Sequence, residues 1–250
     1  MARLKEYNGH YCESEYEYAF IGFLEVEGWK YSSGNNISRV TKRDVLIADD
    51  FKKFIADINP DLTEEEVTQI YDNVRLVGAE SDFATLHKVY GWMVNGVQFT
   101  PQDGLPRMIP LIDFDNWNKN IFRVVNQFTV EYTNNGQKEN RRPDVLLFVN
   151  GMPLCVIELK NPADANATIY DAWEQINIRY WRDIPHLLHY CPLACISDGV
   201  KTRLGTVRTP YEHFYAWRRV NEGDVVSTLP FAETETMIKG VYAPERFMEI

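Results

Sequence analysis

The sequence predicts an α/β (α+β) fold in which a central mixed β-sheet is flanked by helices. The first observation is the order of the patterns along the chain, which runs helix, strands, helix, strand. The second is that 45% of the 250 residues are hydrophobic, enough for one sizeable core. The third is the aromatic fraction of 13%, which indicates a globular chain and excludes a disordered one.

Two stretches carry the clearest helix signals. Residues 13–27 have apolar side chains at helical spacing and end at Gly28, a residue typical of helix C-termini. Glu17 falls on the same apolar stripe, so a carboxylate occupies a face that we expect to be buried. In NPDLTEEEVTQIYDNV, Thr63 is the expected N-cap and Glu66 completes a capping box.

The strand signals gather in the middle of the chain. They predict a hairpin in PDVLLFVNGMPLCVIELK, whose two apolar runs are joined by Asn150-Gly151. The sheet signal ends after about Leu204, and we expect only peripheral helices beyond it. The remaining predictions are a strand over 121–133, a turn over 134–140, a helix over 167–181, a strand over 193–197, and helices over 210–220 and 232–250.

Composition excludes several classes of protein. No apolar run reaches the roughly 18 residues of a membrane span, and the first residues lack the apolar core of a secretion signal. We therefore expect a cytoplasmic protein without a membrane partner. The net charge of −10 argues against a strong sequence-independent nucleic-acid binder, which would present a basic surface. The four cysteines form no CxxC pair and are interpreted as reduced, mostly structural thiols.

Three charged residues interrupt the apolar hairpin. Asp144 precedes its first run, while Glu158 and Lys160 lie two apart near the end of the second, where alternation puts them on one face. A Mg²⁺ ion held by Asp144 and Glu158 could polarise a phosphodiester and activate a water, with Lys160 stabilising charge. A bare Glu-x-Lys pair is common by chance, and strand-end carboxylates often face solvent. The apolar context favours a site here.

The register of the hairpin decides whether Asp144 and Glu158 meet. A strict two-residue turn would place Asp144 opposite Ile157 and turn it away from Glu158. A shared site therefore requires a one-residue shift. A bulge at Gly151 would provide it, as would one near Pro153, which has no N–H to donate. We expect such a bulge in place of a strict two-residue loop.

The pattern Asp144…Glu158-Leu159-Lys160, preceded by a helix glutamate, resembles the PD-(D/E)XK nuclease superfamily. More specifically, the chain resembles the N-terminal endonuclease domain of the restriction (motor) subunit of type I restriction–modification enzymes. The stretches that carry the resemblance extend from Ser14 to Gly199, and the third is the most specific: SEYEYAFIGFLEVEGWKY, LIDFDNWNKNIFRVVNQFTVE, RRPDVLLFVNGMPLCVIELKNP and LLHYCPLACISDG.

The resemblance implies a Mg²⁺-dependent endonuclease that cuts double-stranded DNA within an ATP-driven translocase, alongside methylation and specificity subunits. Asp144 and Glu158 would then be metal ligands, Lys160 the catalytic lysine, and Glu17 the supporting helix glutamate.

The resemblance also implies a division of the chain. Residues 1–205 would form the PD-(D/E)XK endonuclease domain with an N-terminal helical elaboration, and residues 206–250 a helical connector toward a motor (helicase) domain. The sequence contains no GxxxxGK[ST] phosphate-binding loop, so ATP would be bound outside these 250 residues.

One motif departs from the family pattern, which has Q-x-x-x-Y in the helix after the lysine. Gln175 is followed by Arg179 at +4 and by Tyr180 at +5. On a regular helix, Gln175 and Tyr180 would lie roughly 140° apart, compared with about 40° for residues four apart. Either a π-bulge absorbs one residue and keeps both as supporting residues, or Arg179 or a neighbour takes over the role of the tyrosine.

Other interpretations compete with this one. The chain could be a non-catalytic docking module that kept the nuclease fold, although a silent domain has no reason to keep three unpaired charges. It could also be a stand-alone DNA repair nuclease. Glu17 could be solvated on a rotated helix instead of pointing toward Lys160. His186 and His189, three apart in PHLLHY, are interpreted as ordinary helix or loop residues and not as a zinc site.

Overall fold

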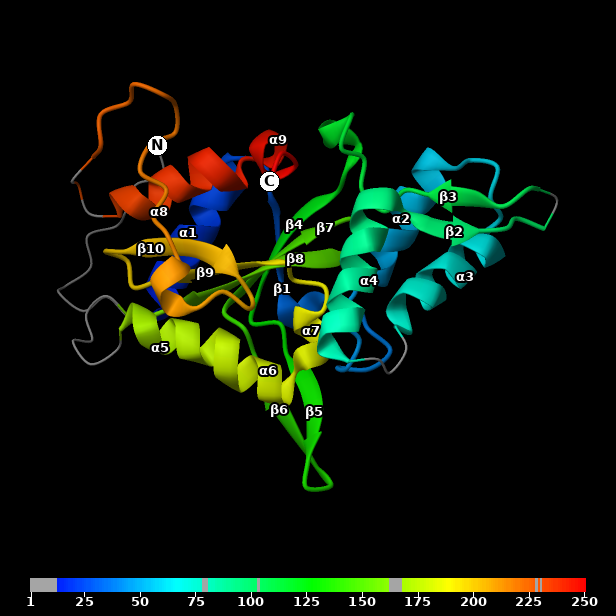
Figure 1. The fold of residues 1–250 in the computed structure, drawn as a ribbon, viewed down its shortest axis with the longest axis horizontal. Coiled ribbons are helices and arrows are strands. Elements are labelled where there is room, and N and C mark those ends of the chain that lie inside the picture. Colours follow the sequence, from blue (N-terminus) through cyan, green and yellow to red (C-terminus); the bar gives the residue numbers. More distant parts are fainter. Residues whose placement is uncertain (1–12, 78–80, 103, 162–167, 228, 230) are drawn as a thin grey trace.

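The computed structural model describes residues 13–77, 81–102, 104–161, 168–227, 229 and 231–250. Its centre is a six-stranded sheet in the order β1-β4-β7-β8-β9-β10 (Figure 1). The pairs β1–β4 and β8–β9 are parallel and the other neighbours are antiparallel, so the predicted mixed sheet is confirmed. The six strands are β1 (Lys30–Ser33), β4 (Phe122–Asn126), β7 (Val145–Val149), β8 (Met152–Leu159), β9 (Leu193–Ser197) and β10 (Thr202–Thr206).

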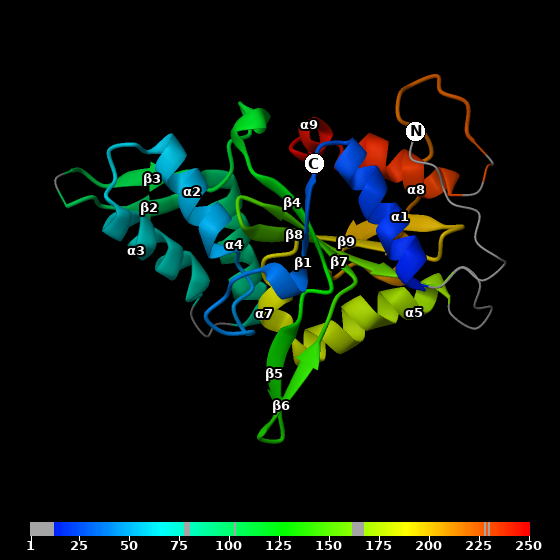
Figure 2. The same ribbon diagram turned by 180° about the vertical axis from the view of Figure 1, so that it is seen from behind.

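Helices cover both faces of this sheet, as Figures 1 and 2 show. Leu159 of β8 pairs with Ser197 of β9, so Ser197 and Glu158 point to opposite faces. Ser197 bonds to Tyr16 of α1 (Glu13–Val26), whereas Glu158 bonds to Tyr180. One face therefore carries α1 and α8 (Ala232–Met237), and the other carries α5 (Ile169–Glu174), a π-helical segment (Gln175–Tyr180) and α6 (Trp181–Asp183). Covered on both sides, every residue of β7 and β8 is buried.

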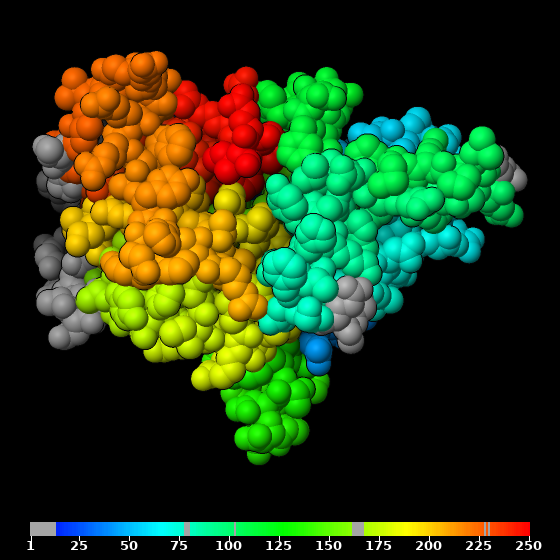
Figure 3. Space-filling view, in the orientation of Figure 1, coloured from blue at the N-terminus to red at the C-terminus, as the bar shows by residue number. Residues whose placement is uncertain are grey.

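A second group of elements packs beside the sheet and forms the lobe seen in cyan and green in Figure 3. It contains the predicted helix with its capping box, in which Thr63 and Glu66 exchange hydrogen bonds. Two helices that were not predicted accompany it. The elements of this lobe are α2 (Ala48–Ile58), α3 (Glu64–Arg75), α4 (Asp82–Asn95), β2 (Val97–Phe99) and β3 (Arg107–Ile109).

The strand predicted over 121–133 is two strands, because the chain turns at Gln127, which has a left-handed φ of +53°. The second, β5 (Val130–Asn134), pairs with β6 (Gln137–Arg141), so most of the predicted turn over 134–140 is a strand. This separate hairpin projects away from the body of the molecule (Figures 1 and 3).

The C-terminal part confirms one helix prediction and contradicts another. Helices occur within 232–250, namely α8, a π-helical segment (Ile238–Tyr242) and α9 (Pro244–Phe247). They are not peripheral as expected, because Met237, Val241 and Tyr242 are fully buried in the core. The helix predicted over 210–220 is reduced to a 3-10 turn at Tyr211–His213. The reason is that Tyr215 exchanges two backbone hydrogen bonds with Leu204, which holds this segment extended against β10, a strand the sequence did not reveal.

Among the described residues, no helix is long and apolar enough to cross a membrane. The described cysteines, Cys155, Cys191 and Cys195, are buried free thiols, as expected. Cys12 lies outside the described residues, as does Ala167 at the start of the helix predicted over 167–181.

Candidate active site

The hairpin of β7 and β8 determines which side chains meet at the site. Its turn is a strict two-residue loop, since Val149 pairs with Met152, and Asn150 and Gly151 both have left-handed φ values of +50° and +76°. A Cβ at position 151 would lie 2.3 Å from the Ile47 carbonyl oxygen, so only glycine fits there. The expectation that the loop itself would be longer is therefore wrong.

The predicted shift occurs instead just after the proline. Phe148 pairs with Pro153 but Leu147 pairs with Cys155, so Leu154 is the extra residue of a β-bulge. Beyond the bulge Val145 pairs with Ile157, which places Asp144 beside Glu158. The expectation of a bulge near Pro153 is thus confirmed, and the two carboxylates share one end of the hairpin.

Each of the two carboxylates accepts a backbone hydrogen bond from the opposite strand end. The Asp144 N–H donates to Glu158 Oε1 (3.4 Å), and the Leu159 N–H donates to Asp144 Oδ2 (2.9 Å). Burial raises the pKa of Asp144. Glu158 is fully buried, and both burial and the neighbouring Asp144 charge raise its pKa well above the usual range.

Neutral donors surround the Glu158 carboxylate. The Tyr180 hydroxyl donates to Oε1 (2.5 Å), and Gln175 Nε2 donates to Oε2 (2.7 Å). The Gln175 carbonyl oxygen accepts a hydrogen bond from Lys160 Nζ (2.8 Å). A single amide side chain therefore holds the glutamate and the lysine at fixed positions relative to each other.

Gln175 and Tyr180 approach the same carboxylate because the helix between them is not regular. Residues Gln175–Tyr180 form a π-helix, which brings residues five apart onto one face. Gln175 Nε2 also lies 2.9 Å from the Tyr180 hydroxyl oxygen. Of the two alternatives, the structure therefore shows the π-bulge, and Arg179 is exposed.

Glu17 is buried on the opposite face of the sheet, with 4% of its surface exposed, so it is not solvated. Its two oxygens accept hydrogen bonds from Asn126 Nδ2 (2.7 Å) and Gln127 Nε2 (2.5 Å). Glu17 was expected to point toward Lys160 or a cation, but these hydrogen bonds place it beside two amides, which stabilise its carboxylate. The Gln127 N–H donates to the Asp144 carbonyl oxygen (3.0 Å), which links this pair to the site.

The sequence reasoning missed Asn126 and Gln127. Both fall inside the stretch that was predicted to be one continuous strand, in which neighbouring side chains point to opposite faces and would not reach the same carboxylate. The signal that could have revealed them is the consecutive polar pair, Asn-Gln, which stands between apolar residues in VVNQF.

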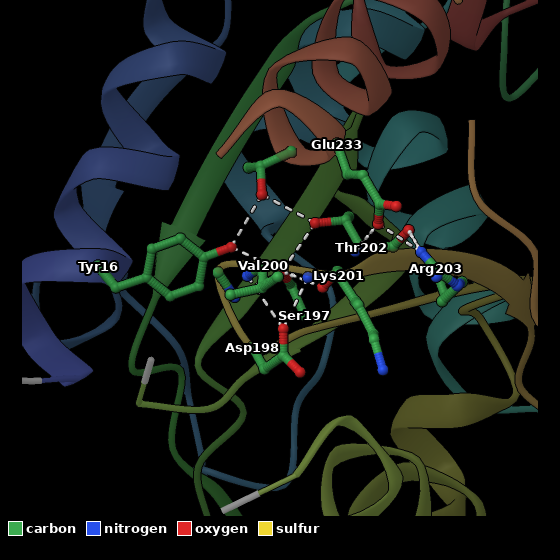
Figure 4. Close-up of polar contacts among 10 residues, drawn as sticks. Tyr16, Ser197, Asp198, Val200, Lys201, Thr202, Arg203 and Glu233 are labelled. Atoms are coloured by element: carbon green, nitrogen blue, oxygen red, sulfur yellow. Dashed lines mark hydrogen bonds and ion pairs between the residues drawn. The ribbon is translucent and has the colours of Figure 1, made fainter. Parts of the chain in front are cut away.

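A ring of four buried hydroxyl groups fastens the helices of one face to the sheet next to the site (Figure 4). Tyr16 bonds to Ser197 (2.6 Å), Ser197 to Thr202 (2.7 Å), Thr202 to Thr234 (2.8 Å), and Thr234 to Tyr16 (3.0 Å). The ring joins α1, β9, β10 and α8. The Ser197 carbonyl accepts the backbone N–H of Lys160 (2.8 Å), so the ring also borders the end of β8.

The donor set at the hairpin end suits a hard divalent cation. In the described part of the chain, no group of three or more His, Cys, Asp or Glu side chains could hold a metal ion. Asp144 and Glu158 could supply two carboxylates, and Mg²⁺ is commonly held by one or two carboxylates with water and phosphate. A cation there would offset the repulsion that raises the pKa of Glu158.

The chain is similar to known proteins over most of its length. Residues 11–213 match the family described as the N terminus of the type I restriction enzyme R protein. The MjaIXP protein of Methanocaldococcus jannaschii, named as a type I restriction enzyme endonuclease subunit, is 32% identical over 93% of this chain and 24% of its own length. The type I restriction enzyme HindI endonuclease subunit of Haemophilus influenzae is 29% identical over 95% of this chain and 23% of its own. The chain thus spans about a quarter of the length of these relatives.

Proposed function

Since the chain belongs to the family of type I restriction enzyme R-protein N termini, we propose that it is the nuclease part of such an enzyme and hydrolyses phosphodiester bonds of double-stranded DNA. The observation that carries the proposal is the charged cluster at the end of the β7–β8 hairpin, in which Glu158 is fully buried and Asp144 and Lys160 are partly buried. There, Glu158 lies beside Asp144 and is joined through Gln175 to Lys160. Two carboxylates at such a site lower the stability of the fold unless a bound cation compensates their charge, because the burial of like charges is unfavourable.

Each residue of the cluster has a role in the proposed reaction. Asp144 and Glu158 would hold Mg²⁺. When bound, the ion would polarise the phosphodiester and lower the pKa of a bound water. Lys160, whose ammonium is fixed by Gln175, would stabilise charge developing on the phosphate. Tyr180 would hold Glu158 in its orientation through the hydrogen bond to Oε1.

ATP-driven translocation and DNA sequence recognition are proposed to reside in other parts of the enzyme. The sequence has no phosphate-binding loop and its net charge is −10, which is unfavourable for DNA binding by this domain alone. We therefore expect the chain to act in a cytoplasmic complex with a motor (helicase) region and with methylation and specificity subunits.

The test is Mg²⁺-dependent cleavage of duplex DNA by the complete enzyme. Glu158→Ala and Lys160→Ala should abolish cutting and leave ATP-driven translocation nearly unchanged, whereas Glu65→Ala, at an exposed position, should affect neither. A correctly folded Lys160→Ala enzyme that still cuts would contradict the assigned role. Absence of Mg²⁺-dependent cutting by the unmodified enzyme would favour a non-catalytic docking module.

A further inference from the structure

Gln127 connects two parts of the site that are far apart in the sequence. It follows β4 directly and, because Asn126 pairs with Val145, it lies across the ladder from Asp144. Its backbone N–H donates to the Asp144 carbonyl, and its side chain donates to Glu17. One residue therefore joins the backbone of a proposed metal ligand to the buried glutamate of α1.

The backbone conformation of Gln127 is unusual for its residue type. A left-handed φ is uncommon outside glycine, and such residues persist where surrounding contacts determine them. The chain after β1 provides one such contact. A Cβ at Gly34 would lie 2.7 Å from the Gln127 carbonyl oxygen, so this turn is packed directly on the segment. The conformation turns β5 out of the main sheet and leaves the Gln127 N–H facing Asp144.

The side chain of Gln127 connects the same segment to Glu17 of α1. Its amide and the amide of Asn126 both donate hydrogen bonds to the buried Glu17 carboxylate. The Asn126 side-chain oxygen in turn accepts a hydrogen bond from the Tyr31 hydroxyl (3.1 Å). The position of α1 relative to β4 is thereby coupled to the backbone segment that borders Asp144.

We infer that Gln127 is a positioning residue for Asp144: its backbone holds the Asp144 main chain and its side chain anchors that segment to Glu17, so the affinity of the site for a divalent cation depends on it. This inference rests on the proposed function, in which Asp144 is a metal ligand. Partners that orient metal ligands typically contribute a factor of about 10 to 100 in metal affinity.

The experiment measures Mn²⁺ binding by the 250-residue chain in a calorimetric titration, with thermal unfolding of each variant recorded without metal. Gln127→Gly removes the amide and relieves the strain of the positive φ, whereas Gln127→Ala removes the amide and keeps the Cβ that causes this strain. Both variants should raise the Kd for Mn²⁺ by roughly tenfold. The glycine variant should unfold at the higher temperature of the two, which separates metal affinity from stability.

Asn135→Ala is the matched control, since Asn135 has a similar φ of +48° at the tip of the β5–β6 hairpin, away from the site. It should lower the unfolding temperature and leave the Kd unchanged. If both Gln127 variants bind Mn²⁺ as tightly as the unmodified chain, Gln127 has only a structural role and the inference is wrong. If the unmodified chain itself binds no Mn²⁺, the proposed metal site fails instead.

Discussion

The hydroxyl of Tyr180 gives the clearest residue-scale test of the site. It donates the shorter of the two side-chain hydrogen bonds to a carboxylate that has no access to water. A hydrogen bond to a charged group contributes about 1.5–3 kcal/mol. Tyr180→Phe should therefore reduce the cleavage rate of the complete enzyme roughly tenfold or more.

Tyr190→Phe is the matched control for this substitution. Tyr190 is also buried, and its hydroxyl donates to the Val74 carbonyl (2.5 Å), outside the candidate site. The control should lose stability like Tyr180→Phe but keep its cleavage rate. Equal cleavage by the two variants would show that Tyr180 is merely part of the core.

At the scale of an element, the π-helix accounts for the altered spacing of the glutamine and tyrosine. A π-bulge arises when one residue is inserted into an α-helix. Deletion of Ile178, which is 49% exposed, should restore an α-helix with the tyrosine four positions after Gln175. The shortened chain should keep the pairing around Glu158, unfold at a similar or higher temperature, and cut DNA in the complete enzyme.

A deletion in a regular helix provides the comparison. Removing the exposed Lys53 from the middle of α2 rotates the following buried residues, Phe54 and Ile55, by about 100° and should lower the unfolding temperature strongly. If the Ile178 deletion is equally damaging, the π-helix is required for packing and the insertion explanation fails.

The same elements show which features of the fold and the site could be predicted from the sequence. Spacing indicated a bulge at Gly151 or near Pro153, and it left a π-bulge as one of two alternatives for the helix, because each would bring the site residues to one face. The structure has the bulge near Pro153 and the π-helix. It did not predict the break of the strand at Gln127, since that depends on a left-handed backbone held by tertiary contacts. The extended segment at Tyr215 was missed for a similar reason, because pairing with β10 overrode its local helical pattern.

At the scale of the whole molecule, one histidine has a buried ring nitrogen without a partner in the described structure. His186 lies in α7 (Pro185–Leu188), and its Nε2 atom is buried with no hydrogen bond in the described structure. Burial lowers the pKa of His186 from 6.5 to about 4, and the nearby charges of Arg43 and His189 act in the same direction. The folded chain therefore disfavours the charged form of this imidazole.

This imidazole makes the stability of the whole chain depend on pH. Between about pH 6.5 and pH 4 the unfolded chain binds the proton and the folded chain does not, so stability should fall as the pH drops through this window. One pKa unit corresponds to about 1.4 kcal/mol, which limits the effect to about 3 kcal/mol.

His186→Leu should flatten the curve of unfolding free energy between pH 4 and pH 7, measured by urea denaturation. The carboxylates that also titrate at low pH are the same in both proteins, and His87→Leu, at an exposed position, should leave the curve unchanged. If the His186→Leu curve parallels that of the unmodified chain, the imidazole must be hydrated or partnered in solution and does not determine this pH dependence.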